Sequence, residues 1–251
     1  MNDSPLLIAV HGWMLSRQVW EPFVKTWEQR GIPVTLWCPD LPGFGDRIRP
    51  KTLLPTLAAY GRWLATQALD RAAGRPFILM GHSLGGSVVL HAEAELRRNA
   101  KSGLCGLVCV AAGGGIYQPK PFRQLRSIGR LVINMRPEGL HQLPPPLGRL
   151  GPLRAESRAA RGLLVNSTSR GAVRQLPGMV ARLAVNSLWI SGERDQVMEP
   201  GYVRHLAGYS SGHDYREITN CGHLPMREQP EALCTEIETW LIAQSLARPR
   251  S

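Results

Sequence analysis

A serine, an aspartate and a histidine each follow a predicted strand, and these three residue types together can build a strong nucleophile. Ser83 lies in the stretch GHSLG, Asp195 in SGERD and His223 in CGHLP. A serine hydroxyl attacks a carbonyl carbon only weakly unless a histidine takes its proton and a carboxylate orients that histidine. Their order along the chain therefore predicts a catalytic triad of Ser83, Asp195 and His223.

The glycines around Ser83 indicate a sharp turn from a strand into a helix. Gly81 and Gly85 flank the serine at the spacing G-x-S-x-G, with an apolar run on each side. Such a turn crowds the residues beside its apex, so glycine is needed there. The serine at the apex is expected to be strained, with its oxygen exposed. The start of the following helix favours negative charge that develops nearby.

A second loop with a chemical role is predicted after the first strand, where the sequence reads HGWM at 11–14. We expect the backbone N–H groups of Trp13 and Leu84 to face the oxyanion that forms during attack on a carbonyl. We interpret His11 as a residue that fixes this loop by hydrogen bonding rather than as a catalyst. The side chains predicted to line the substrate pocket are those of Met14, His82 and Leu224.

Strands and helices alternate along most of the chain. The predicted strands are 6–10, 33–37, 76–80, 104–111, 186–191 and 213–218, and the predicted helices are 16–30, 53–71, 84–99 and 230–246. This alternation predicts an α/β fold in which parallel strands are covered by helices on both faces. Reactive residues then gather in loops at the carboxyl ends of the strands, which is where the predicted triad lies.

Residues 113–178 interrupt the alternation. They are rich in proline and arginine, and we predict that they form a cap insert on a core made of 1–112 and 179–251. Two short helices within the insert would each place arginines on about one face, where they could bind an anion. These arginines are Arg123, Arg126 and Arg130 in the first helix, and Arg154, Arg158 and Arg161 in the second.

Most of the net charge of +11 comes from this part of the chain. Residues 116–180 contain 11 of the 30 Lys and Arg residues and only 2 of the 19 Asp and Glu residues. Four interpretations stay open: a solvated arginine-rich surface, a docking face for an acidic acyl carrier protein, a site for a small carboxylate or phosphate substrate, or a contact with an anionic membrane surface. Nucleic acid is not expected, because no recognition fold is apparent.

Composition is that of an ordinary globular chain, with 251 residues and 43% hydrophobic content. The longest apolar runs are strand-sized, so no transmembrane segment is expected, and no secretory signal is visible, which predicts a cytoplasmic protein. The five cysteines include no CxxC pair, and we interpret them as structural thiols. A zinc site is therefore not expected. Oligomeric state is left open.

These motifs resemble those of the α/β-hydrolase superfamily. The matching stretches are HGW at 11–13, DLPGFG at 40–45, GHSLGG at 81–86, SGERD at 191–195 and CGHLP at 221–225. The resemblance covers nearly the whole chain outside the cap insert. It implies the α/β-hydrolase fold with a helical cap and, because the chain starts at the family's third strand, about six strands. It also implies hydrolysis of a carboxylic ester or thioester through an acyl-enzyme, with no metal or organic cofactor.

Two branches of the superfamily suggest different reactions. The stretch HGWMLSRQVW at 11–20 is similar to the oxyanion segment of the pimeloyl-[acyl-carrier protein] methyl ester esterases of biotin synthesis, which dock an acidic carrier protein on a basic cap. The lyases of menaquinone and phylloquinone synthesis carry an arginine four residues after the nucleophile, where this chain has Ser87. A cofactor-free C–C or C–O lyase and a non-catalytic binding module on the same fold stay as alternatives.

Overall fold

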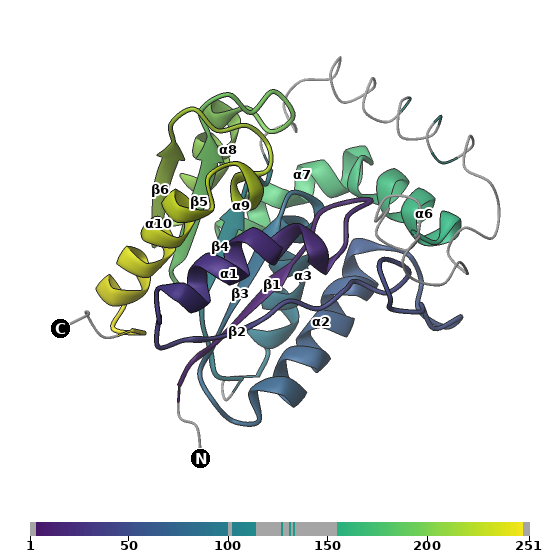
Figure 1. Cartoon of the computed structure of the whole chain (residues 1–251). Helices are drawn as coiled ribbons and strands as arrows, with labels where there is room; N and C mark the ends of the chain where they lie inside the picture. The colour runs from purple at the N-terminus through teal and green to yellow at the C-terminus, as the bar shows by residue number, and fades with distance from the viewer. Residues whose placement is uncertain are drawn as a thin grey trace.

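Six parallel strands form the centre of the molecule, in the order β2-β1-β3-β4-β5-β6 (Figure 1). The computed structural model describes residues 4–99, 102–113, 127, 131, 133 and 155–247. The strands are β1 Leu6–Val10, β2 Thr35–Trp37, β3 Phe77–His82, β4 Leu104–Val110, β5 Ser187–Gly192 and β6 His213–Ile218. Every adjacent pair runs parallel. The predicted α/β class and the expected number of strands are confirmed.

Helices cover both faces of this sheet, and the strand sequences explain why. Every residue of β1 is fully buried, and its side chains alternate between two separate apolar clusters. A strand that is buried on both faces must be apolar throughout, unlike one with a wet face. The first cluster is covered by α2 Leu57–Ala72, α3 Leu84–Leu96 and α8 Pro200–Ala207, and the second by α1 Glu21–Gln29, α9 Pro225–Glu228 and α10 Pro230–Ala243.

Prolines account for two differences between the predicted and observed helices. The expected helix at 16–30 is divided into a 3₁₀ turn at Arg17–Trp20 and α1, which has Pro22 in its first turn. The expected helix at 53–71 begins only at Leu57, because Pro55 disfavours helical backbone before it and Thr56 caps the helix. No helix in the described ranges combines the length and the apolar composition that crossing a bilayer requires.

Two helices of the predicted cap insert are described, α6 Ser157–Ser167 and α7 Arg170–Val180. They follow β4 in the chain and precede β5, and Figure 1 shows α7 near the upper end of the strands with α6 to its right. Most of the remaining insert lies outside the described residues. Helix α7 continues two residues past the expected boundary at 178, and the division into core and cap stays a prediction.

An ion pair at the start of α6 fastens the cap to the loop after β2. Arg49 Nε and Nη2 donate to the two carboxylate oxygens of Glu156 at 2.7 and 2.6 Å, and the Glu156 N–H donates to the Gly43 carbonyl at 2.6 Å. Only 4% of the Arg49 side chain is exposed. A second fastening joins the Leu57 N–H to Asn166 Oδ1 at 2.8 Å. Helix α6 is therefore held on the core at both of its ends.

Replacing Glu156 with alanine is expected to lower the free energy of unfolding by about 2–3 kcal/mol, because the buried Arg49 guanidinium loses its carboxylate. Breaking a fully buried ion pair costs about 3–5 kcal/mol. The loss here should be at or below the lower of these values, since 30% of the Glu156 side chain is exposed. Urea unfolding measures it. The control is Glu95→Ala, which breaks the exposed pair with Arg98 and should cost less than about 1 kcal/mol. Equal losses in both variants would contradict the fastening role.

Candidate active site

Ser83 lies at the turn between β3 and α3 in a strained backbone conformation. Its φ is 52° and its ψ is −116°, a region that costs a residue other than glycine about 1–3 kcal/mol. The turn is so tight that a Cβ on Gly81 would collide with the Gly85 carbonyl, and a Cβ on Gly85 would lie 2.6 Å from the Val10 oxygen. The two glycines of the motif are therefore required by close approach of the backbone.

His223 and Asp195 form a hydrogen-bonded pair in the loops that follow β6 and β5. His223 Nδ1 lies 2.8 Å from Asp195 Oδ2 and must donate, since a carboxylate only accepts. The Asp195 side chain is fully buried, whereas 23% of the His223 side chain is exposed. The other oxygen, Oδ1, accepts the N–H groups of Val197 and Met198 at 2.8 and 2.9 Å. This pairing puts the lone pair of the imidazole on Nε2, where it can take a proton.

The Ser83 turn and the His223 loop are joined through His82. His82 Nε2 donates to the His223 carbonyl at 2.8 Å, and the two ring centroids are 4.8 Å apart. Within the described chain, Ser83 Oγ has no hydrogen-bond partner. In resting enzymes the bond from nucleophile to base is often long and shortens when substrate binds. The structure thus brings the serine turn and the Asp195–His223 pair to the same edge of the sheet.

His11 joins the loop after β1 to the loop after β2. Its Nε2 accepts the Leu41 N–H at 3.0 Å, and its Nδ1–H donates to the Gly12 carbonyl at 2.8 Å. Burial lowers the pKa of His11, which keeps the ring neutral. A Cβ on Gly12 would lie 2.7 Å from His82 Nδ1, so the loop approaches the turn closely. His11 makes the loop-fixing hydrogen bonds that we expect.

Trp13 and Leu84, the two residues of the predicted oxyanion hole, both line a cleft beside Ser83. Among the described residues, neither backbone N–H has an acceptor. Leu84 is the first residue of α3, and the first N–H groups of a helix have no partner within the helix. The indole N–H of Trp13 donates to the Ala160 carbonyl of α6 at 2.8 Å, which ties this loop to the cap.

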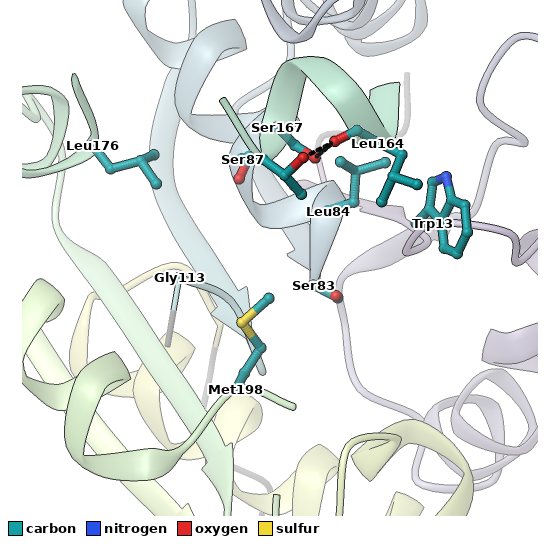
Figure 2. A pocket seen from close by; sticks show the side chains of 10 residues that line it. Trp13, Ser83, Leu84, Ser87, Gly113, Leu164, Ser167, Leu176 and Met198 are labelled. Atoms are coloured by element: carbon teal, nitrogen blue, oxygen red, sulfur yellow. Dashed lines mark hydrogen bonds between the residues drawn. The ribbon is translucent and has the colours of Figure 1, made fainter. Parts of the chain in front are cut away.

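The cleft has a volume of about 560 Å³, counting the part that opens to solvent. Figure 2 shows Ser83 between Trp13 and Leu164 on one side and Met198 on the other. The described residues that line it are apolar or carry hydroxyl groups, and none carries a charge. They are Trp13, Ser83, Leu84, Ser87, Gly113, Leu164, Ser167, Thr168, Leu176 and Met198.

The three side chains predicted to line the substrate pocket lie outside this described lining. Met14 has a φ of 59° and packs in the apolar cluster on the α2–α3 face, with 6% of the residue exposed. His82 is 1% exposed and donates to the backbone carbonyl of His223. Leu224 is half-buried against the opposite cluster. None of the three is among the described residues that line this cleft, so their assignment to the substrate pocket stays a prediction.

The predicted anion-docking arginines are only partly described. Arg158 and Arg161 are exposed on α6, as the expected arginine face requires. The other four, Arg123, Arg126, Arg130 and Arg154, lie outside the described residues. The described part of α7 adds two exposed arginines that were not predicted for docking, Arg170 and Arg174.

Several residues that line the cleft are absent from the sequence-based prediction. For two of them, Ser87 and Met198, the position in the sequence could have indicated that they lie near the cleft. Ser87 lies in the first turn of α3, four residues after Ser83, so it is expected near the serine. Met198 follows Asp195 by three residues and donates its N–H to the same carboxylate. Ser167 and Thr168 carry no such signal, because they reach the cleft only through the docking of α6.

Comparison with known proteins shows the family to which the fold belongs. Residues 7–236 match the model of a family described as the alpha/beta hydrolase family. The chain is 27% identical to the pimeloyl-[acyl-carrier protein] methyl ester esterase of Stenotrophomonas maltophilia (strain K279a), over 97% of this chain and 95% of that protein. Identity to the enzyme of the same name from Xanthomonas axonopodis pv. citri (strain 306) is 28%, over 90% of each chain.

A solved structure shows the same fold at lower identity. The thermophilic esterase from Thermogutta terrifontis superposes with a TM-score of 0.70 at 21% identity, covering 96% of this chain and 90% of that one. The resemblance seen in the sequence motifs is therefore confirmed: the chain belongs to the alpha/beta hydrolase family.

Proposed function

We propose that the chain hydrolyses a carboxylic ester or thioester, with Ser83 as nucleophile, His223 as base and Asp195 as the residue that orients the base. The observation that carries this proposal is the hydrogen bond from His223 Nδ1 to the buried Asp195 carboxylate, in loops that meet the strained Ser83 turn. The names of the relatives support the reaction class, since they are esterases.

The reaction would proceed through an acyl-enzyme. His223 Nε2 takes the hydroxyl proton as Ser83 Oγ attacks the carbonyl carbon, and the N–H groups of Trp13 and Leu84 stabilise the oxyanion. The alcohol or thiol leaves with the proton from His223, and the acyl group stays on Ser83. Water then attacks the acyl-enzyme with His223 again as base, and the acid is released. Asp195 stabilises the charged imidazole in both steps, so these side chains and N–H groups suffice without a cofactor.

An uncharged group fits the cleft best. Its described walls offer apolar surface and the hydroxyls of Ser87, Ser167 and Thr168, with no arginine or lysine to pair a buried carboxylate. A free acid at the reacting end is therefore disfavoured, and a small neutral ester such as a methyl ester is favoured. This also weighs against the lyase alternative, whose substrate is rich in carboxylates.

An acidic or carrier-linked remainder of the substrate would stay outside the cleft, against the arginines of α6 and α7. Relatives are named for a methyl ester carried on an acyl carrier protein. Arg158 is exposed on α6, and the nearby carboxylate of Glu156 is already paired with Arg49, so it does not neutralise this face. Basic surfaces of this kind attract acidic proteins and raise their association rates.

A substrate panel tests the proposal. It compares p-nitrophenyl butyrate, a methyl ester linked to acyl carrier protein, and a long-chain lipid ester. We expect turnover of the first two, a lower KM for the carrier-linked ester, and a KM that rises with salt for that ester alone. Arg158→Glu should raise that KM, while Lys25→Glu, on the exposed side of α1, should not.

The remaining interpretations are outcomes of the same panel. Equal kinetics for free and carrier-linked esters would reject carrier docking, and preferred turnover of the lipid ester on anionic vesicles would favour a membrane substrate. A lyase would leave every ester intact while it acts on a carboxylate-rich substrate. A binding module would turn over nothing.

A further inference from the structure

We propose that His82 and Glu228 are positioning residues that hold the backbone of His223 from two sides, so that its imidazole stays aimed at Ser83. This inference rests on the proposed function and adds two residues to it. Neither would touch the substrate. Both act on the peptide groups around His223, and their contacts are separate from the Asp195 hydrogen bond to its ring.

His82 holds the carbonyl of His223. A carbonyl only accepts, so the 2.8 Å contact requires the proton on His82 Nε2. His82 is 1% exposed, and burial together with the nearby His223 ring lowers its pKa well below the usual value. The ring is therefore neutral, with its one proton committed to His223. Because His82 immediately precedes Ser83, this bond joins the nucleophile to the backbone of its base.

Glu228 accepts the backbone N–H groups of the two residues that flank His223, Gly222 and Leu224. Its Oε2 accepts the Gly222 N–H at 2.6 Å, and its Oε1 accepts the Leu224 N–H at 2.9 Å. A Cβ on Gly222 would lie 2.9 Å from the same carboxylate, so a larger residue there would push the Glu228 side chain away from the loop. Glu228 is the last residue of α9, which places its side chain next to the loop that precedes the helix.

The combined contacts leave the His223 loop little freedom. The ring is bonded to Asp195, the carbonyl to His82, and the flanking amides to Glu228. A carboxylate that accepts N–H bonds forms the stronger, charge-assisted kind. A shift of about 1 Å in a catalytic group can cost on the order of 10²-fold in rate. Loss of either positioning residue should therefore slow the chemistry while leaving the cleft unchanged.

The test measures kcat, KM and thermal unfolding for a set of matched variants, with p-nitrophenyl butyrate as substrate. His82→Phe removes the donor and keeps a ring, whereas His82→Gln keeps an N–H at about the position of Nε2. Glu228→Ala removes both acceptors. Arg227→Ala is the control, because Arg227 is the exposed neighbour of Glu228 on α9 and makes neither contact.

We expect kcat to fall about 10²-fold in His82→Phe and in Glu228→Ala, with little change in KM. His82→Gln should recover most of the loss, and Arg227→Ala should behave as the wild type. A fluorophosphonate probe should still label Ser83 completely in both slow variants, but more slowly. Because both residues fix the same loop, the double variant should lose less than the product of the two single losses.

Wild-type kcat in folded His82→Phe and Glu228→Ala, or a loss confined to KM, would overturn the proposal. Glu228 is exposed, so the Glu228→Ala variant is expected to fold. If His82→Phe is unstable, the kcat of Glu228→Ala still tests the proposal. Failure of the proposed function looks different: Ser83→Ala would then retain turnover, whatever these variants do.

Discussion

Replacing Ser83 with alanine is expected to reduce kcat for p-nitrophenyl butyrate by roughly 10⁴–10⁶-fold. The proposed acyl-enzyme cannot form without Ser83 Oγ, and what remains is the contribution of binding and of the oxyanion hole. Alanine should keep the turn, because its methyl group takes the place of the serine Cβ at a φ of 52°. Steady-state kinetics and thermal unfolding on the same preparation measure both effects.

The control for this variant is Ser211→Ala. Ser211 is exposed in the turn that precedes β6, at the edge of the sheet opposite to the proposed active site. It should retain wild-type kcat. Turnover by Ser83→Ala within tenfold of the wild type would contradict the assignment of the nucleophile. Trace contamination is ruled out when the activity scales with variant concentration across independent preparations.

Replacing Asp195 with asparagine is expected to reduce kcat by about 10⁴-fold with the fold preserved. The N–H groups of Val197 and Met198 both donate to Oδ1, so the asparagine oxygen should stay there and its NH₂ group should face His223. The imidazole would then accept at Nδ1 and carry its proton on Nε2. In that tautomer it cannot take a proton from Ser83.

Raising the pH should not restore the activity of Asp195→Asn below the range in which Ser83 itself loses its proton, because the defect is the tautomer of a neutral ring. A pH–rate profile for kcat/KM checks this. A loss smaller than about tenfold at pH 8, with the unfolding temperature unchanged, would contradict the role of Asp195. It would point instead to another carboxylate as the partner of His223.

The strands and the turn that position the site could be predicted, because their residue patterns are compatible with only one kind of local structure. The run at 6–10 is apolar at every position, as a strand covered on both faces must be, and the structure has a strand at Leu6–Val10. The turn at 81–85 was equally constrained, since only glycine fits where Gly81 and Gly85 approach the neighbouring backbone. The order of the strand ends then placed Asp195 and His223 at one edge of the sheet.

The walls of the cleft could not be predicted, because they depend on contacts between distant segments. Ser167 and Thr168 border it only because α6 is fastened to the core through Glu156 and Asn166. Met14 is predicted to line the pocket, but the described lining of this cleft does not include it, and it packs in the apolar cluster on the α2–α3 face. Neither fact has a local sequence signature.

The contacts that position His223 could not be predicted from the sequence either. The motif CGHLP marks the histidine, and GHSLG marks the serine, yet neither reveals that His82 of one motif bonds the backbone of the other. Glu228 lies outside both motifs and reaches the loop from α9, a short helix that the sequence pattern did not predict. Such contacts emerge only when the loops are assembled in three dimensions.

Covalent labelling of Ser83 tests the central claim most directly. The protein is treated with a fluorophosphonate, its intact mass is measured, and the modified peptide is mapped while turnover of p-nitrophenyl butyrate is followed in the same samples. We predict one adduct per chain, on Ser83, with loss of turnover in proportion to labelling, and no adduct in Ser83→Ala. An adduct on a different residue, or full turnover after Ser83 is completely labelled, would contradict the account.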